Sequence, residues 1–428
     1  MTNRIENFKK LINYFEQNTI EYALLGRKQN LEEIIEGDID IVVSQQYFKK
    51  IEQILDKFCQ KNNLLFIQNI QHESTAKYMI ISDKSDHSII CPDICSHYVR
   101  DARLLIENKL LLANTTLIDV QGFKVRTLNP QHEFLYYFLK KIDKANIGER
   151  EFNHLKKQYD LIKSNKKLIS LDKNFSKETI YEINKIFSTQ DITLLNKRLV
   201  DYRNELHSKK TKHWMFLVKD ILLKIKRIYK KTGLTIAIMG SDGCGKSTII
   251  KALSKSMEPA FRNVHYYHLK PTDKKIHGVD TTNPHGQKPY SFSKSLLKLG
   301  FLITQYNFGF IEVFKKNIKS TFVIFDRYYD DILIDKLRFR YGAPIFFARI
   351  ASFFIPKPKL YFLLDASGEV IFKRKKELSI QEIDRQRDSY LKLFRSKKNY
   401  YIIDASKEVD FVTYNIETII LSYLNKRL

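Results

Sequence analysis

A glycine-rich stretch between Ala237 and Ile250, AIMGSDGCGKSTII, constrains this chain more than any other part of its sequence. It fits the pattern G-x-x-x-x-G-K-[ST], with the apolar run LTIAIM before it and the helical run STIIKALSKSM after it. Glycines let the backbone curl so that successive N–H groups point inward at phosphate oxygens. The positive end of the following helix adds to this attraction. We therefore predict a strand, a phosphate-binding loop and a helix.

The residues predicted to bind the nucleotide phosphates form one segment: Gly240, Ser241, Asp242, Gly243, Cys244, Gly245, Lys246, Ser247 and Thr248. Lys246 is expected to reach the β and γ phosphates, and the Ser247 hydroxyl is expected to ligate Mg²⁺. The pattern therefore predicts a bound nucleoside triphosphate with Mg²⁺.

A second motif, VIFDRYYDD, ends an apolar run at Asp326 and Arg327. A carboxylate at the carboxyl end of a strand faces the nucleotide crevice in doubly wound sheets. Arg327 beside it can neutralise the charge of a phosphorylated acceptor. A salt bridge at the strand end, without a role in catalysis, is the alternative interpretation.

The length and the pattern of apolar runs predict two domains and a connector. A chain of 428 residues is too long for one ordinary core. We expect an α+β domain over residues 1–165 and a helical, lysine-rich connector over residues 166–232. From residue 233 to 428, the runs LTIAIM, NVHYYHL, TFVIF, KLYFLL and YYII are separated by helical lengths. Continuous apolar strands at this spacing predict an α/β domain with a doubly wound parallel sheet.

Several motifs of the C-terminal part occur in an order that resembles the thymidylate kinase branch of the nucleoside monophosphate kinases. They are GSDGCGKST, FDRYYDD, PKPKLYFLLDASGEVIFKRKKE, RDSY and YIIDAS. The resemblance implies a P-loop kinase that transfers the γ-phosphoryl group of ATP to a small phosphorylated acceptor. It also implies that Arg374 and Arg387, together with Arg385, supply cations from a lid to the transferring group.

Two segments depart from the thymidylate kinase pattern, and both concern the acceptor. HLKP, with Lys270 and Pro271, replaces an Arg-Glu-Pro-like signature, and DDILIDKLRFRYG replaces a stretch rich in Ser and Ala. A nucleoside monophosphate such as dTMP is the first acceptor we expect. DRYYDDILIDKLR together with PKPKLYFLLD resembles kinase-like proteins that accompany surface-polysaccharide gene sets, so a sugar or lipid-linked precursor is the alternative.

Three carboxylates in the N-terminal part raise a separate hypothesis. Asp38 and Asp40, in DIDIVV, are two residues apart on an expected strand and so project from one face. Asp93 on a neighbouring strand would complete a Mg²⁺ site. This arrangement resembles the nucleotidyltransferase superfamily, except that Arg27 follows Gly26 where that superfamily has Ser. An edge strand with solvated acids and a fold with altered chemistry are the alternatives.

Charge and composition limit which binding partners and which cellular compartment we expect for this protein. The formal net charge is +25, from 73 basic and 48 acidic residues, but the lysines are spread along the chain, which disfavours a dedicated nucleic-acid surface. A nucleotide-dependent switch that binds nucleic acid or a membrane surface is kept as an alternative, and a homodimer is left open. The longest apolar runs are shorter than the roughly 20 residues of a membrane span. Four cysteines in no even framework favour a cytoplasmic setting.

Overall fold

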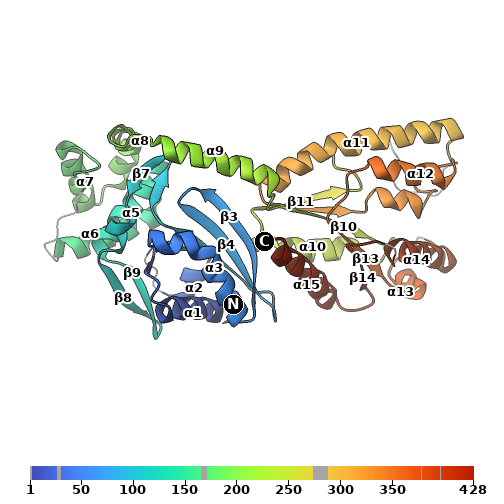
Figure 1. Cartoon of the computed structure of the whole chain (residues 1–428), viewed down its shortest axis with the longest axis horizontal. Helices are drawn as coiled ribbons and strands as arrows, with labels where there is room; N and C mark the ends of the chain where they lie inside the picture. Colours follow the sequence, from blue (N-terminus) through green and yellow to red (C-terminus); the bar gives the residue numbers. More distant parts are fainter. Residues whose placement is uncertain (1, 27–29, 165–170, 273–287, 377, 396) are drawn as a thin grey trace. The chain divides into compact units, whose positions relative to one another are not determined.

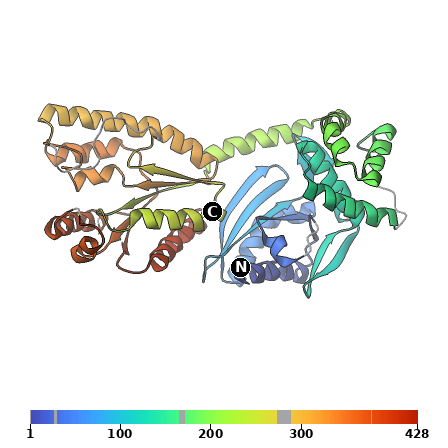
Figure 2. The same ribbon diagram turned by 180° about the vertical axis from the view of Figure 1, so that it is seen from behind.

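The chain forms two compact units, each with its own sheet (Figures 1 and 2). The first consists of Met1–Lys226 and Leu424–Leu428, and the second of Arg227–Tyr423. The finer domain boundaries at residues 165 and 232 stay a prediction. The structure, a computed structural model, describes residues 2–26, 30–164, 171–272, 288–376, 378–395 and 397–428.

A mixed sheet in the order β3-β4-β5-β2-β1-β9-β8 forms the frame of the first unit. Its strands are β1 (Tyr22–Leu24), β2 (Asp38–Val43), β3 (Leu64–Glu73), β4 (Ala76–Asp83), β5 (Ile89–Cys95), β8 (Thr115–Val120) and β9 (Phe123–Leu128). A separate hairpin pairs β6 (Tyr98–Arg100) with β7 (Arg103–Ile106).

Alternating side chains along β2 give the first unit a core on each face of its sheet. Ile39 and Ile41 pack into one core, with buried residues of α1 (Thr2–Gln17) and α3 (Gln45–Lys61). Val42 packs into the other core, with α5 (Pro130–Lys144). Because successive strand residues face opposite sides, Asp38 and Asp40 share the face of Val42 and α5. The identification of this unit with a nucleotidyltransferase fold stays a prediction.

Two helices of the expected connector pack into the core of the first unit. Ile183 and Phe187 of α7, and Leu195 and Tyr202 of α8, are buried against residues of α5. By contrast α9, which follows them, has no buried residue, and its whole length is described. The bounds are α2 (Leu31–Ile35), α4 (Asn108–Leu112), α6 (Glu149–Ser164), α7 (Lys177–Thr189), α8 (Ile192–Lys209) and α9 (Trp214–Tyr229).

The second unit contains a parallel five-stranded sheet in the order β11-β12-β10-β13-β14. Its strands are β10 (Leu234–Met239), β11 (Asn263–His268), β12 (Thr321–Asp326), β13 (Leu360–Asp365) and β14 (Tyr400–Asp404). Every residue of β10 and β12 is buried, which explains why these strands are continuous apolar runs in the sequence. The predicted α/β region with a parallel sheet is confirmed, and it is consistent with a P-loop kinase fold.

Helices cover both faces of this parallel sheet, with α11 and α12 on one face and α10 and α15 on the other (Figures 1 and 2). The helices, including the short 3₁₀ helices η1 to η3, are α10 (Lys246–Ser256), η1 (Glu258–Ala260), α11 (Phe292–Ile318), η2 (Tyr329–Leu333), α12 (Ile345–Ala351), η3 (Ser352–Phe354), α13 (Gly368–Arg374), α14 (Ile380–Arg395) and α15 (Val409–Arg427).

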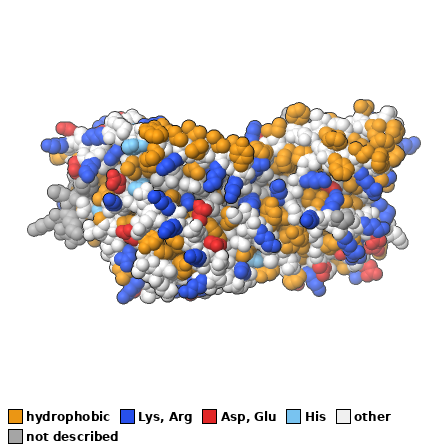
Figure 3. Space-filling model, in the orientation of Figure 1, with side chains coloured by type: hydrophobic (Ala, Val, Ile, Leu, Met, Phe, Trp, Pro, Cys, Tyr) orange, Lys and Arg blue, Asp and Glu red, His pale blue; other side chains and the backbone are white. Residues whose placement is uncertain are grey.

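Large apolar side chains of α11, α12 and η3 gather on the surface of the second unit (Figure 3). The most exposed of them are Leu297, Phe301, Phe308, Phe346, Phe353 and Phe354. Within the described ranges, no helix combines the length and the apolar character that crossing a membrane requires.

Two glycines of α11 test how closely this helix approaches its neighbours. A Cβ atom added at Gly309 would lie 2.2 Å from the carbonyl oxygen of Pro271, whereas one added at Gly300 would meet open space. We expect Gly300→Ala to stabilise the second unit by up to about 1 kcal/mol, since alanine is the better helix former. Gly309→Ala should destabilise it by roughly 1–3 kcal/mol through overpacking. Thermal unfolding measures both, and equal shifts in the two variants would contradict the close approach.

Candidate functional site

The phosphate loop joins the buried strand β10 to α10, and three of its glycines adopt conformations that other residues rarely take. Gly240, Gly243 and Gly245 have φ angles of +141°, +86° and +96°. A Cβ at Gly243 would lie 2.9 Å from the Cβ of Lys375, so this position also lacks the space for a side chain. The loop therefore has the curled backbone that the motif predicts, and it leads directly into the first turn of α10.

The side chain of Lys246 is folded back over the loop. Its Nζ donates to the carbonyl oxygens of Gly240 and Ser241 at 3.0 and 2.9 Å, and it lies 3.9 Å from Oδ1 of Asp242. Only 7% of the residue is exposed. Ser247 and Thr248, by contrast, are exposed at the start of the helix.

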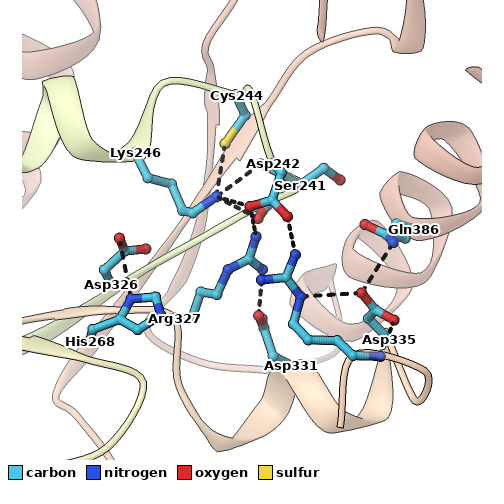
Figure 4. A network of polar contacts seen from close by, with 12 residues as sticks. Ser241, Asp242, Cys244, Lys246, His268, Asp326, Arg327, Asp331, Asp335 and Gln386 are labelled. Carbon is cyan, nitrogen blue, oxygen red and sulfur yellow. Dashed lines mark hydrogen bonds and ion pairs between the residues drawn. The ribbon is translucent and has the colours of Figure 1, made fainter. Parts of the chain in front are cut away.

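Asp242 joins three cations at the centre of the site (Figure 4). Its Oδ1 accepts from Arg327 at 2.6 Å, its Oδ2 accepts from Arg338, and Lys246 lies next to it. Burial by itself would raise the pKa of Asp242, but Arg327, Lys246 and Arg338 together hold this pKa well below its usual range. The carboxylate is therefore ionised at neutral pH and balances part of the positive charge.

Arg327 is buried and connected on several sides. It follows β12 with a φ of +69°, and its backbone N–H donates to the carbonyl of Ile238 at 2.9 Å. Its guanidinium donates to Asp331 at 2.5 Å and to the hydroxyl of Tyr390 at 3.3 Å, and Tyr390 donates in turn to Asp331 at 2.8 Å. Burial would lower the pKa of Arg327, but Asp331, Tyr390 and Asp242 outweigh it and raise the pKa further. The arginine is thus a permanently charged, immobilised group.

Asp326 ends β12, in register with Ile238 of β10 and His268 of β11. Its Oδ2 accepts from the hydroxyl of Tyr266 at 3.3 Å and lies 3.7 Å from Nδ1 of His268. Its Oδ1 is buried and has no hydrogen-bond partner among the described residues. A buried carboxylate oxygen with no partner beside a phosphate loop is a candidate contact for a ligand.

Sequence reasoning missed Arg338 and the residues that hold it. The side chain of Asp335 accepts from the backbone N–H of Arg338 at 3.1 Å and from its Nε at 3.4 Å. Gln386 of α14 donates to the same carboxylate at 3.4 Å. One signal in the sequence could have indicated Arg338. It is the spacing of Asp331, Asp335 and Arg338 within DDILIDKLRFRYG, the segment that departs from the thymidylate kinase pattern.

The expected lid arginines have other partners in this structure. Arg374 donates to the carbonyl oxygen of Ala405 at 2.9 Å. Arg387 forms a bidentate pair with Asp365, at 2.7 and 2.9 Å. Arg385 donates to both carboxylate oxygens of Glu382 on its own helix. The structure therefore brings Lys246, Asp242, Asp326 and Arg327 together, and it does not bring these three arginines to them.

The N-terminal carboxylates lie close together in the first unit. Asp40 of β2 is the register partner of Asp93 of β5, and Lys140 of α5 donates to Asp40 at 3.1 Å. Burial, followed by Asp40 and Asp38, raises the pKa of Asp93 to about 7. Among the residues that the structure describes, no group of three or more His, Cys, Asp or Glu side chains is arranged to hold a metal ion. The metal role of these carboxylates stays a prediction.

The turn at Gly26, which precedes the carboxylates in the sequence, is described only in part. Gly26 has a φ of +75°, and its N–H donates to Glu133 of α5 at 3.3 Å. Arg27, which stands where the nucleotidyltransferase superfamily has Ser, lies outside the described residues.

Comparisons with known proteins point to one family. Residues 238–416 match the family model described as thymidylate kinase. The thymidylate kinase of Thermosipho africanus is 24% identical over 200 residues, which cover 44% of this chain and 98% of the relative. The probable thymidylate kinase of Sulfolobus acidocaldarius is 25% identical over 206 residues, covering 44% and 97%. Among solved structures, thymidylate kinase from Ehrlichia chaffeensis matches 44% of this chain and 98% of its own, with 18% identity and a TM-score of 0.31.

The matched segment lies within the second unit, which is thus a thymidylate kinase-like domain. The second unit is an ATP-dependent kinase domain of the nucleoside monophosphate kinase type, and the prediction of a kinase is confirmed.

Asp242→Asn tests the charge balance of the site through its pH dependence. At pH 7 we expect the variant to be less stable than the wild type by roughly 1–3 kcal/mol, because three cations lose their counter-charge. The folded-state pKa lies below the unfolded one, so this stabilisation is present above about pH 4 and is lost as the pH falls. The difference in melting temperature should therefore shrink from pH 7 to pH 3.

Asp388→Asn is the matched control, since Asp388 is exposed on α14 and lies outside the network. We expect it to change the melting temperature little at either pH. A wild-type advantage over Asp242→Asn that stays constant with pH would show that Asp242 does not balance the cations.

Proposed function

We propose that this thymidylate kinase-like domain transfers the γ-phosphoryl group of Mg·ATP to a small phosphorylated acceptor, first of all a nucleoside monophosphate such as dTMP. The observation that carries the proposal is the convergence of Lys246, Arg327 and Arg338 on one carboxylate beside the phosphate loop. Cations so placed suit a group whose transfer spreads negative charge over several oxygens. The family match over residues 238–416 supports the same reaction.

The residues present fit ATP and Mg²⁺. A side chain at Gly240 would collide with Cys244 and Leu364, and one at Gly243 with Lys375, so only glycine allows the curled backbone that a phosphate loop requires. The exposed hydroxyl of Ser247 would ligate Mg²⁺, and the buried Oδ1 of Asp326 suits a magnesium-bound water. When bound, Mg²⁺ neutralises charge on the β and γ phosphates.

The chain itself supplies binding and orientation. Lys246 leaves the loop carbonyls for the β and γ phosphates, because a phosphate oxygen is a stronger partner for an ammonium group than a neutral carbonyl. Arg327, held by Asp331 and Tyr390, orients the phosphate of the acceptor. An acceptor oxygen then forms a bond to the γ-phosphorus while the bond to the leaving oxygen of ADP breaks. Most of the rate enhancement comes from positioning and electrostatics.

Arg374 and Arg387 would exchange their present hydrogen-bond partners for the nucleotide during the reaction. Arg374 is the last residue of α13 and is bound to Ala405, and Arg387 lies in the middle of α14 and is bound to Asp365. Closure over a bound nucleotide would exchange these partners for phosphate oxygens. Such closure steps commonly assemble the site of a kinase only when both substrates are present.

A nucleotidyl transfer in the first unit is a second candidate function. The observation that favours it is the register pairing of Asp40 with Asp93, whose pKa is raised by burial and then by the charge of Asp40. Lys140 partly neutralises the pair. The test is pyrophosphate release from nucleoside triphosphates with Mg²⁺ or Mn²⁺. Loss of this release in Asp40→Asn but not in Lys246→Ala would support it.

The kinase proposal predicts ADP release from Mg·ATP that rises when the right acceptor is added. The purified chain is assayed with a panel of nucleoside monophosphates that includes dTMP. We expect Lys246→Ala to lower the stimulated rate at least a hundredfold, because the transferring group loses its main cation. Lys251→Ala, an exposed lysine of the same helix, is the control and should leave the rate unchanged.

Failure of every nucleoside monophosphate to stimulate ADP release would exclude a thymidylate-type acceptor. Stimulation by phosphosugars or glycan intermediates would then assign the reaction to that class instead. ATP binding without turnover, combined with a steep loss of nucleic-acid or vesicle binding as salt rises, would favour a nucleotide-dependent switch.

Arg338→Gln tests the cation that sequence reasoning missed. Because Arg338 touches Asp242 and is held by Asp335, we expect the variant to lower kcat/KM for the acceptor about ten- to a hundredfold. Arg349→Gln changes the same residue type at an exposed position of α12 and should leave kcat/KM unchanged. Equal values for the two variants in steady-state kinetics would remove Arg338 from the site.

A further inference from the structure

A cavity in the first unit lies apart from the N-terminal carboxylates and has no role in the proposed kinase reaction. Its volume is ≈ 410 Å³, within the range of small-molecule sites. It is bounded by β7, α4, the first turns of α5, the turn after residue 171 and the end of α8. The start of α5 is well defined, because Asn129 caps it by accepting from the N–H of His132 at 2.9 Å.

Positive charge gathers at one side of this cavity. Lys173, Lys209 and Lys210 line it, and the acidic residue in its lining is Glu107. Burial and then the charge of Lys173 lower the pKa of Lys210, and Glu107 offsets part of this repulsion. Neither Lys173 nor Lys210 forms an ion pair within the described part of the chain, and Lys209 has only Glu205 at 3.7 Å. An anion between Lys173 and Lys210 would relieve this repulsion.

A buried amide group also indicates that the cavity binds a ligand, independently of the lysines. Asn174 lines the cavity and is only 4% exposed. Its Nδ2 is buried and has no hydrogen-bond partner among the described residues. Buried polar groups are nearly always paired in folded proteins, so an unpaired donor in a cavity wall is a mark of a ligand acceptor.

The cavity lining also has an apolar part. Leu105, Ile106 and Leu135 are each at most 5% exposed, and Leu110, which also lines the cavity, is 44% exposed. Burial lowers the pKa of His132, so this imidazole lines the cavity in its neutral form at neutral pH. A ligand that fits both parts of the lining carries an anionic group and an apolar group next to each other.

We propose that this cavity binds a small phosphorylated molecule that also carries an apolar or aromatic group. The phosphate lies between Lys173 and Lys210 and accepts a hydrogen bond from Asn174. The apolar group lies on the wall formed by Leu105, Ile106 and Leu135. The first unit is thereby a ligand-binding module with a phosphate site of its own, separate from the phosphate loop of the second unit.

The test measures binding to the full-length chain by isothermal titration calorimetry with three probes: phenyl phosphate, inorganic phosphate and phenol. We expect phenyl phosphate to bind more tightly than either of the others. The double variant Lys173→Ala/Lys210→Ala should remove one phenyl phosphate site per chain or weaken it at least tenfold. The control Lys50→Ala/Lys57→Ala removes two exposed lysines of α3 and should bind like the wild type.

Asn174→Ala provides a second, uncharged variant, and a loss of affinity in it too would support the assignment. The proposal is overturned if no probe binds the wild type at millimolar concentration, or if the double variant and its control bind phenyl phosphate equally. Equal affinity for phenol and phenyl phosphate would also overturn it, because the cavity would then recognise only the apolar group. Melting temperatures near that of the wild type establish that the variants are folded.

Discussion

The ionised carboxylate of Asp242 is the interaction on which the rest of the phosphate site depends. Lys246, Arg327 and Arg338 come from three different elements and meet at this one side chain. Two like charges about 4 Å apart repel by roughly 4 kcal/mol at an effective dielectric constant near 20. Asp331 and Asp335 also neutralise Arg327 and Arg338, but Asp242 is the carboxylate that all three cations share, and its loss would weaken the geometry that a transferring phosphoryl group needs. The carboxylate keeps them assembled in the absence of a ligand.

The parallel sheet determines where this cluster can form. Residues of β10 and β12 are paired in register up to Ile238 and Asp326, so both strands end at the same edge. The phosphate loop leaves one strand there, and Arg327 leaves the other. A one-residue slip of β12 would turn Asp326 to the opposite face of the sheet. Burial of both strands on two faces makes such a slip costly, because it would expose apolar side chains.

The parts of the site that are local in sequence were predictable, and the parts assembled from distant segments were not. The loop from Gly240 to Thr248 carries its own geometry, since its glycines and the helix that follows act on their immediate neighbours. The parallel sheet of the second unit was likewise predictable from runs of apolar residues. The proximity of Arg338 to Asp242 depends on the path of the chain after η2, and Gln386 reaches Asp335 only because α14 packs beside it. Lys140 beside Asp40 is the same kind of long-range contact in the first unit.

Asp242 also determines which anions can bind to the three cations of the site. Because this carboxylate is tethered to the loop, its effective concentration beside the cations is on the order of millimolar or higher, and a free anion has to compete with it. Chloride and other singly charged anions make one weak contact each and are poor competitors. A phosphate with two negative charges and three acceptor oxygens can engage all three cations at once. The site thus favours phosphate over singly charged anions before any specific recognition of a base or a sugar begins.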